Sequence, residues 1–391
     1  MTTLRLISAD GALTGVPLND TATYTRPASA LRSRVAYAAA HVVPKVHADN
    51  TPGRSADIDW DATLAFRRNV YSWGLGVADA MDTAQRNMGL DPAATRELIT
   101  RSAEVARETG GSVVVGVNTD HVEEAHISLD KVIDAYKEQL HFTEEQGARP
   151  VLMSSRHLAR AATNGADYLR VYGEVLRSAN VPVVLHWLGP AFDPELKGYF
   201  GAPDWQAAAE ILLEIIAENT DKVAGVKMSL LNAESEISVR ERLPEGVRMF
   251  TGDDFNYVGL IGGDAVDQEA TGYSDALLGA FAAITPVASA AIQALDEGDA
   301  ERYQQILGPT EELSRQVFAA PTFYYKTGVA FLSWLNGHQP AFQMVGGLHS
   351  ARSLPHLSRI VELANSSLAL ENPELALGRW HTMLRLNGVD A

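Results

Sequence analysis

The sequence predicts an α/β protein whose main unit is a (β/α)8 TIM barrel, with an N-terminal hairpin extension and a C-terminal helical extension. Eight short apolar runs, most of them rich in valine, alternate with long amphipathic segments between residues 34 and 266. This alternation is typical of a parallel sheet covered by helices, and eight repeats favour a closed barrel. A doubly wound open sheet is the alternative, but no G-x-G-x-x-G follows the first run.

The predicted elements follow one another in a regular order. Residues 4–18 resemble a small hairpin that turns at Asp10 and Gly11. The eight predicted strands are residues 34–43, 70–77, 112–118, 149–155, 181–187, 223–229, 247–253 and 259–266. Helical segments lie between them, and one of these segments has a plausible N-cap at Asp91 with Pro92 in the first turn.

The strand signals stop at about residue 275, and the later segments have helical patterns up to the C-terminus. No low-complexity linker marks an independent second domain, so this helical part is expected to pack on the barrel. The predicted division is residues 1–33 as an N-terminal extension, 34–275 as the barrel and 276–391 as the C-terminal helical region.

Composition excludes several classes of function. The chain has 391 residues, of which 46% are hydrophobic and 21% charged, as expected of a globular protein with a large core. The net charge of −17 disfavours nucleic acid and acidic membranes as partners. There is no cysteine, no run near the ~20 apolar residues of a membrane span, and no secretory signal at the start. A cytoplasmic protein is therefore expected.

Several predicted strands end in polar residues, whereas the strand interiors are apolar. In a (β/α)8 barrel the chemistry takes place at the carboxyl ends of the strands, so these side chains are expected to converge on one pocket. They include His41, Asp79, Asn118, Ser154, Ser155, His186, Lys227, Asp253 and Asp254.

Lys227 is the most informative of these residues, because it is a lysine near the end of the apolar run VAGVKMS. Burial in a barrel wall lowers the pKa of a lysine and favours the neutral amine. A neutral amine attacks a carbonyl to give a Schiff base, whose iminium form permits cleavage of a neighbouring C–C bond. The alternative is a lysine that reaches solvent or pairs with Asp253 or Glu234.

Three segments carry a resemblance to a known superfamily: VPVVLHWLGP at 181–190, GVKMS at 225–229 and TGDDFNYVGLIGGDAV at 251–266. They resemble the dihydrodipicolinate synthase / N-acetylneuraminate lyase superfamily of class I aldolases. The likeness extends over roughly residues 34–365 and includes AAPTFYYKTGVAFLSWLNG at 319–337. The resemblance implies that Lys227 is the imine-forming lysine and that the chain is a divergent branch of unknown function.

The departures from that superfamily bear on mechanism. His186 stands where the family has the tyrosine of Y-N-x-P, which relays protons, so the resemblance implies that His186 is a general acid/base. A hydrogen-bonded core histidine is the alternative. Ser155 falls where the family often has a second relay tyrosine, and Asn118 matches a strand end that lines the pocket.

The second departure bears on the substrate. The family's G-T-T-G-E turn, which binds a 2-oxo acid carboxylate, corresponds to GLGVADAMDT at 74–83, with Asp79 and Asp82. Carboxylates repel a carboxylate and accept hydrogen bonds from hydroxyl groups, which favours a polyhydroxylated keto sugar or sugar-acid derivative. Asp79 as a helix cap is the alternative. Asp253 and Asp254 are expected to orient Lys227 or bind hydroxyl groups, although Asp254 is also placed to cap the helix at Phe255.

The predicted protein is therefore a Schiff-base lyase of carbohydrate metabolism that needs no cofactor, binds a small carbonyl compound and forms a homo-oligomer. The catalytic residues are Lys227 and His186, with substrate-binding Asp79, Asn118, Ser155, Asp253 and Asp254. Arg156 and His157 are candidates to hold an anionic group, or else a solvated helix start. The rivals are a metal-dependent TIM-barrel isomerase or hydrolase, whose candidate ligands are His41, His47, His121, His157 and His186, and a non-catalytic sugar-binding relative. No H-E-x-x-H occurs, so no metal ligand is assigned.

Overall fold

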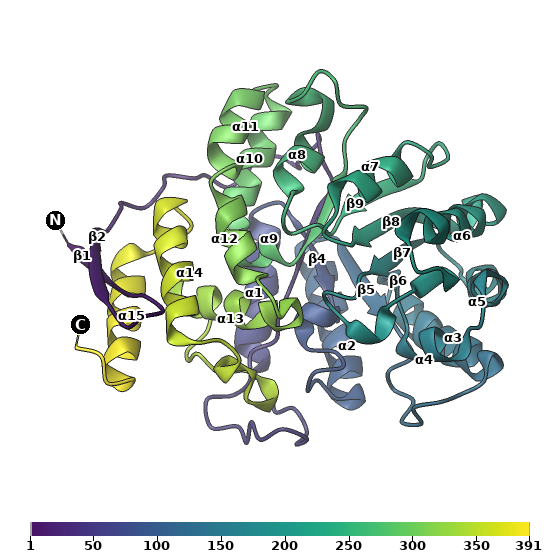
Figure 1. Ribbon diagram of the computed structural model, residues 1–391, viewed down its shortest axis with the longest axis horizontal. Coiled ribbons are helices and arrows are strands. Elements are labelled where there is room, and N and C mark those ends of the chain that lie inside the picture. Colours follow the sequence, from purple (N-terminus) through teal and green to yellow (C-terminus); the bar gives the residue numbers. More distant parts are fainter. Residues whose placement is uncertain (1, 391) are drawn as a thin grey trace.

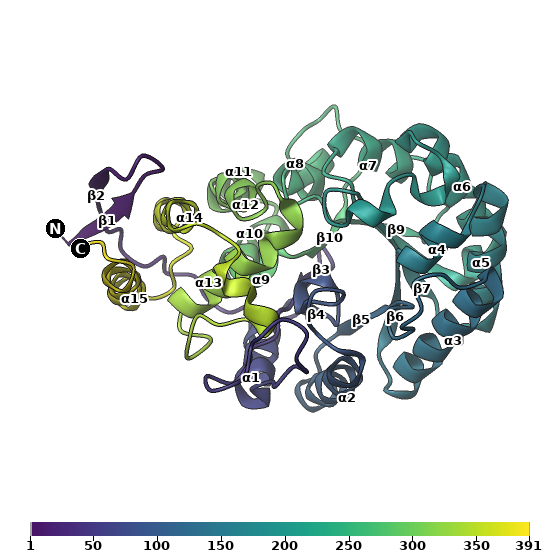
Figure 2. The same ribbon diagram turned by 60° about the horizontal axis from the view of Figure 1, so that its bottom comes forward.

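The computed structural model describes residues 2–390, and its main feature is a closed barrel of parallel strands (Figures 1 and 2). Each strand pairs with the next along the chain and the last pairs with the first, so the barrel has no free edge. The strands are β3 (Ala36–Ala39), β4 (Gly76–Asp79), β5 (Val113–Val117), β6 (Arg149–Met153), β7 (Val183–Leu188), β8 (Val223–Ser229), β9 (Arg248–Thr251) and β10 (Asp275–Leu278). The predicted (β/α)8 barrel is confirmed.

Helices follow the barrel strands and cover the outside of the sheet (Figure 2). They are α1 (Trp60–Ser72), α2 (Pro92–Thr109), α3 (Leu129–Glu145), α4 (Arg156–Ala161), α5 (Gly165–Ser178), α6 (Trp205–Glu218), α7 (Ala233–Arg240) and α8 (Tyr257–Gly262). The start of α2 is as predicted, because Asp91 accepts a hydrogen bond from the Ala94 N–H and Pro92 is in the first turn. No helix within residues 2–390 has both the length and the apolar character that a membrane crossing requires.

The prediction of the eighth strand at residues 259–266 is wrong. These residues form α8 and a short 3-10 turn, and the eighth strand is β10. Gly263 has a φ of +50°, and a Cβ atom there would lie 2.7 Å from the Cβ of Tyr273, so this part of the chain is a tight corner. The run 70–77 is also divided, because its first residues complete α1 and β4 begins only at Gly76.

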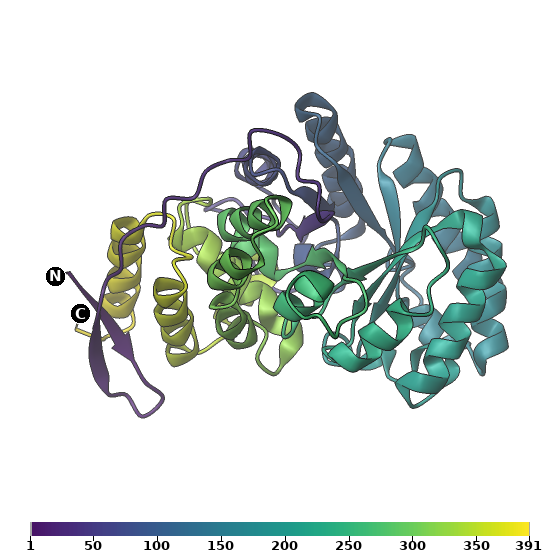
Figure 3. The same ribbon diagram turned by 90° about the horizontal axis from the view of Figure 1, so that it is seen from above.

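The C-terminal part of the chain is helical, as predicted. It comprises α9 (Ala280–Ala283), α10 (Thr285–Asp296), α11 (Ala300–Leu307), α12 (Thr310–Val317), α13 (Tyr325–Leu335), α14 (Leu354–Ser366) and α15 (Pro373–Leu386). The predicted hairpin is also present, as β1 (Thr3–Ile7) and β2 (Leu13–Pro17). Figure 3 shows it beside α14 and α15, away from the barrel. The Trp380 indole N–H donates to the Arg5 carbonyl at 2.6 Å. The three-part division at residues 33/34 and 275/276 stays a prediction.

The inside of the barrel is apolar except near the carboxyl ends of the strands. Its buried cluster is Tyr37, Ala39, Ala78, Met81, Val114, Val151, Met153, Val184, Phe250 and Leu277. His186 of β7, Lys227 of β8 and Phe250 of β9 are direct neighbours in the strand register. Because neighbouring residues of a parallel sheet point to the same face, His186 and Lys227 point into the barrel with Phe250.

One buried carboxyl group lies outside the barrel interior, on α7. Glu236 is 1% exposed, accepts a hydrogen bond from the Ser274 hydroxyl at 2.7 Å, and has no partner for Oε2 among residues 2–390. Burial raises the pKa of Glu236 to about 8, although the hydrogen bond from Ser274 opposes this. The native state therefore holds a proton on Glu236 that the unfolded chain releases from about pH 4.5 upward.

We expect Glu236 to make the wild-type protein lose stability between about pH 4.5 and pH 8, on the order of a few kcal/mol, because over this range the unfolded chain ionises Glu236 while the native state still holds the proton. Glu236→Gln keeps the acceptor for Ser274 and cannot ionise, so its melting temperature should fall less over this range. Glu234→Gln, on the exposed side of the same helix, is the matched control. If the melting temperatures of Glu236→Gln and the wild type change in parallel from about pH 5 to pH 8, the assignment is contradicted.

Candidate active site

Lys227 lies in the wall of the barrel at the carboxyl end of β8 and is 5% exposed. Gly252 makes room for it, because a Cβ atom at position 252 would lie 2.8 Å from the Lys227 Cε. In the described part of the chain, no carboxylate is within ion-pair distance of the Lys227 nitrogen. Burial lowers the pKa of Lys227, and the charges of Asp82 and Asp254 partly oppose this. The amine therefore releases its proton more easily than an exposed lysine does.

His186 lies beside Lys227 on the neighbouring strand. Its Nε2 is 3.2 Å from the Ser229 hydroxyl, and its Nδ1 is buried without a hydrogen-bond partner among residues 2–390. Burial holds the pKa of His186 well below its usual value, and the neighbouring Lys227 lowers it further. The imidazole is thus neutral, and Nδ1 is free to exchange a proton or a hydrogen bond.

The two aspartates after β9 have different environments. Asp253 binds the turn that follows it, because its carboxylate accepts from the N–H groups of Phe255 (2.9 Å) and Asn256 (3.2 Å). Asp254 instead belongs to the surroundings of Lys227 and accepts one hydrogen bond, from the Ala280 N–H at 2.9 Å. Burial raises the pKa of Asp254 well above its usual value, which Lys227 partly opposes. The turn contacts expected of Asp254 are therefore made by Asp253.

Asp79 is fully buried and forms a two-point ion pair with Arg67 of α1. The Arg67 Nε–Oδ2 and Nη2–Oδ1 distances are 3.0 and 2.8 Å, and Asp79 also accepts from the Ala80 N–H. Both oxygens are thereby occupied, and Asp79 makes no helix cap. Asp82, three residues later, is the second carboxylate whose charge acts on Lys227, beside Asp254, and the Tyr325 hydroxyl donates to Asp82 at 2.7 Å.

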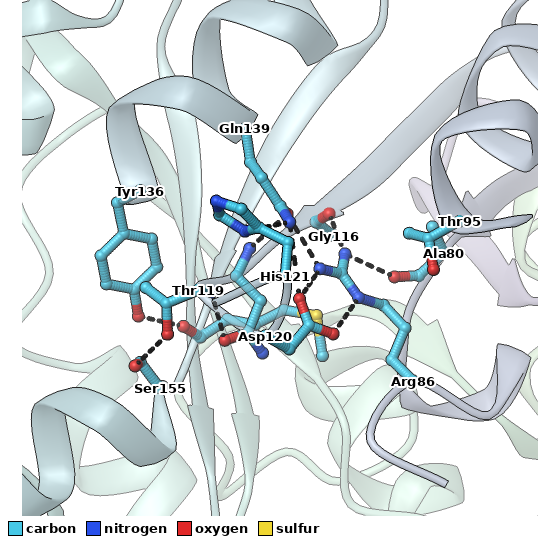
Figure 4. A network of polar contacts seen from close by, with 12 residues as sticks. Ala80, Arg86, Thr95, Gly116, Thr119, Asp120, His121, Tyr136, Gln139 and Ser155 are labelled. Carbon is cyan, nitrogen blue, oxygen red and sulfur yellow. Dashed lines mark hydrogen bonds and ion pairs between the residues drawn. The ribbon is translucent and has the colours of Figure 1, made fainter. Parts of the chain in front are cut away.

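Asn118 and Ser155 follow neighbouring strands, and both contact Thr119. Figure 4 shows the polar network in which Thr119 and Ser155 lie. The Ser155 hydroxyl contacts the Thr119 hydroxyl at 2.7 Å and caps α4 through the Leu158 N–H. The Asn118 side chain accepts from the Thr119 N–H at 2.7 Å. Figure 4 shows that the network continues through Gln139 to an ion pair between the buried Arg86 and the partly buried Asp120. These contacts fix the ends of β5 and β6 relative to each other.

Two side chains that sequence analysis did not select come from the first turn of α13. Tyr325 is buried, and its hydroxyl contacts Thr83 as well as Asp82. Lys326 is 2% exposed, with its nitrogen 3.2 Å from the Met88 sulfur. Both residues stand at the start of the apolar helix YKTGVAFLSWL, so the signal that identified Lys227, a lysine beside an apolar run, was present here too.

In the part of the chain that the structure describes, neither a metal site nor the main cavity coincides with the predicted site residues. Over residues 2–390, no group of three or more His, Asp or Glu side chains is arranged to hold a metal ion. A cavity of about 510 Å³ opens at the amino ends of the strands, where Tyr37, Arg149 and Arg248 line it. None of the predicted site residues lines this cavity.

Comparison with solved structures shows the fold. Dihydrodipicolinate synthase from Aquifex aeolicus matches with a TM-score of 0.65 and 14% identity, over 87% of this chain and 100% of that one. The 4-hydroxy-tetrahydrodipicolinate synthase from Methylacidiphilum fumariolicum matches at 0.62 and 14%, over 90% and 99%. KD(P)GA from T. tenax matches at 0.56 and 17%, over 89% and 99%.

These structures confirm the predicted resemblance at the level of the barrel and its helical extension. No curated protein matches the sequence. A family model described as "Protein of unknown function (DUF993)" matches residues 4–389. The chain therefore belongs to the DUF993 family, and its fold is that of the dihydrodipicolinate synthases.

Proposed function

We propose that this protein is a class I aldolase-type lyase that forms a Schiff base between Lys227 and a small carbonyl compound. The observation that carries the proposal is the buried amine of Lys227, held at the carboxyl end of a barrel strand with no carboxylate of residues 2–390 in contact. Such an amine loses its proton more easily than an exposed lysine does, which favours its use as a nucleophile. Solved structures with the same fold include dihydrodipicolinate synthase and KD(P)GA, which supports the reaction class.

Two neighbours of Lys227 supply the proton transfers. When the amine attacks the carbonyl carbon, a C–N bond forms and the oxygen must leave as water, which needs a proton donor. Asp254 suits this role, because burial raises the pKa of its carboxyl group well above the usual value and so favours the protonated form. His186 suits the second transfer: its neutral imidazole accepts the proton of a substrate hydroxyl as the C–C bond breaks and its electron pair passes to the iminium.

The substrate class follows from the groups around the amine. Asp82 faces Lys227 and, with the Tyr325 hydroxyl bound to one oxygen, still offers an acceptor to a substrate hydroxyl. This supports a polyhydroxylated keto compound. In four of the predicted residues the polar atoms already contact neighbouring groups of the protein: Asp79, Asn118, Ser155 and Asp253. We therefore assign these residues to holding the loops of the site in position. The iminium is itself the electron sink, so the reaction needs no cofactor.

Borohydride reduction tests the proposal directly. We expect that incubation with keto sugars and keto sugar acids, followed by sodium borohydride, leaves a stable adduct on the peptide that contains Lys227. Mass spectrometry of the digest identifies the modified residue, and the exposed Lys197 serves as the internal control. If every adduct is found equally on exposed lysines, or none is found at Lys227 across the panel, the Schiff-base mechanism is wrong.

A further inference from the structure

Lys326 is a second buried lysine, and the proposed mechanism does not use it. It is the second residue of α13 and is 2% exposed. Its nitrogen contacts the Met88 sulfur at 3.2 Å, and among residues 2–390 no carboxylate lies within ion-pair distance. A thioether is only a weak hydrogen-bond acceptor, so it does not replace the hydration that a buried ammonium group loses. The position lacks an anion in contact.

The charged groups that act on Lys326 place it at the same end of the barrel as Lys227. They are Asp82, Arg156 and Asp193, which follow β4, β6 and β7 in the chain. Asp82 is also one of the two carboxylates whose charge acts on Lys227. Helix α13 therefore brings a lysine to the carboxyl ends of the strands, where the loops of three different strands meet it.

Among residues 2–390, the pairing within this group of two cations and two aspartates leaves N–H donors unused on both cations. Asp193 is occupied by Arg156, with an Nε–Oδ2 distance of 2.7 Å, and Asp82 accepts from Tyr325. The Arg156 Nη1 and Nη2 atoms make no hydrogen bond within the described residues, and the side chain is 34% exposed. Two cationic groups therefore keep donors for a ligand. The two aspartates disfavour a dianion such as phosphate more strongly than a carboxylate.

We propose that Lys326 and Arg156 form a subsite for a carboxylate of the substrate, between α13 and the loops that follow β4, β6 and β7. The ammonium and guanidinium groups would bind the carboxylate through charge-assisted hydrogen bonds. This inference rests on the proposed function and narrows its substrate to a keto sugar acid. It also assigns a role to the C-terminal helices, which supply the group that distinguishes an acid from a neutral sugar.

Ligands without a carbonyl test the subsite independently of imine formation. D-Gluconate and D-glucitol differ only in a carboxylate in place of a CH₂OH group, and neither can form a Schiff base in its open-chain form. By titration calorimetry, we expect the wild type to bind D-gluconate about tenfold more tightly than D-glucitol or better. In Lys326→Met the ratio of the two dissociation constants should fall to about one, whereas Lys227→Met should keep the wild-type ratio.

The controls separate the outcomes. Lys197→Met removes the same charge from an exposed position after β7 and should leave the preference unchanged. Arg156→Met, at a partly exposed position, should reduce the preference for D-gluconate about threefold. This variant still tests the subsite if Lys326→Met does not fold. A preserved preference in both Lys326→Met and Arg156→Met, or none in the wild type, overturns the proposal. Tighter binding of D-glucitol 6-phosphate than of D-gluconate overturns the assignment to a carboxylate.

Failure of the subsite and failure of the proposed function give different results. If borohydride leaves no adduct on Lys227 but D-gluconate still binds through Lys326, the lyase mechanism is wrong and the carboxylate subsite stands. If Lys227 is trapped equally well by 5-keto-D-gluconate and by L-sorbose, which differ only in that carboxylate, the mechanism stands and the subsite is wrong.

Discussion

Replacing Lys227 by methionine is expected to abolish turnover and, at the same time, to make the folded protein more stable. Without the amine no Schiff base forms, so the rate with a keto substrate should fall by about 10⁴-fold or more. Methionine fills a similar volume and removes an amine that is buried without an ion-pair partner among residues 2–390. The free energy of unfolding should therefore rise by about 1–3 kcal/mol. The measurements are carbonyl consumption and urea unfolding at neutral pH.

Both halves of this expectation are needed, because together they identify Lys227 as a residue kept for function at a cost in stability. Lys197→Met, which removes an exposed lysine from the loop after β7, should change neither quantity. A Lys227→Met protein with the wild-type rate would refute the Schiff base. A variant that unfolds more easily than the wild type would show that Lys227 supports the barrel wall.

The features that the sequence revealed are those that depend on local patterns. Apolar runs alternating with amphipathic helices predicted the closed barrel, because each βα unit has its own periodicity. Lys227 and His186 could be selected because each interrupts an apolar strand, and the strand register does place them side by side. The eighth strand was misplaced because DALL is only four residues long and buried on both faces, which leaves no alternation to detect.

The features that were missed depend on contacts between distant parts of the chain. Asp79 was predicted to bind substrate, since nothing in its surroundings revealed that Arg67, 12 residues earlier, occupies its carboxylate. Tyr325 and Lys326 lie more than 230 residues from their partners Asp82 and Met88. Periodicity carries no information on such pairs, because the approach of α13 to the barrel is decided by tertiary packing.

The ion pair between Arg67 and Asp79 leads to the largest expected effect on stability. Both side chains are fully buried, and Arg67 also donates to the carbonyls of His41 (2.5 Å) and Thr63 (3.1 Å). Arg67→Met would leave the Asp79 carboxylate buried without its cation, which should cost about 3–5 kcal/mol of unfolding free energy. The adjacent Arg68 pairs with Glu108 at the surface, so Arg68→Met is a matched control expected to cost about 0–1 kcal/mol.

This pair also holds the turn that presents Asp82 to Lys227. Ala80 has a φ of +48°, a left-handed conformation unfavourable for alanine, and its N–H donates to Asp79 at 2.8 Å. Replacing Asp79 by leucine in Arg67→Met removes the unpaired charge and should restore part of the stability, but it also removes the acceptor that holds the turn. The double variant is therefore expected to fold yet to turn over substrate more slowly than the wild type. If Arg67→Met loses no more stability than Arg68→Met, the buried ion pair stabilises neither the strand nor the turn.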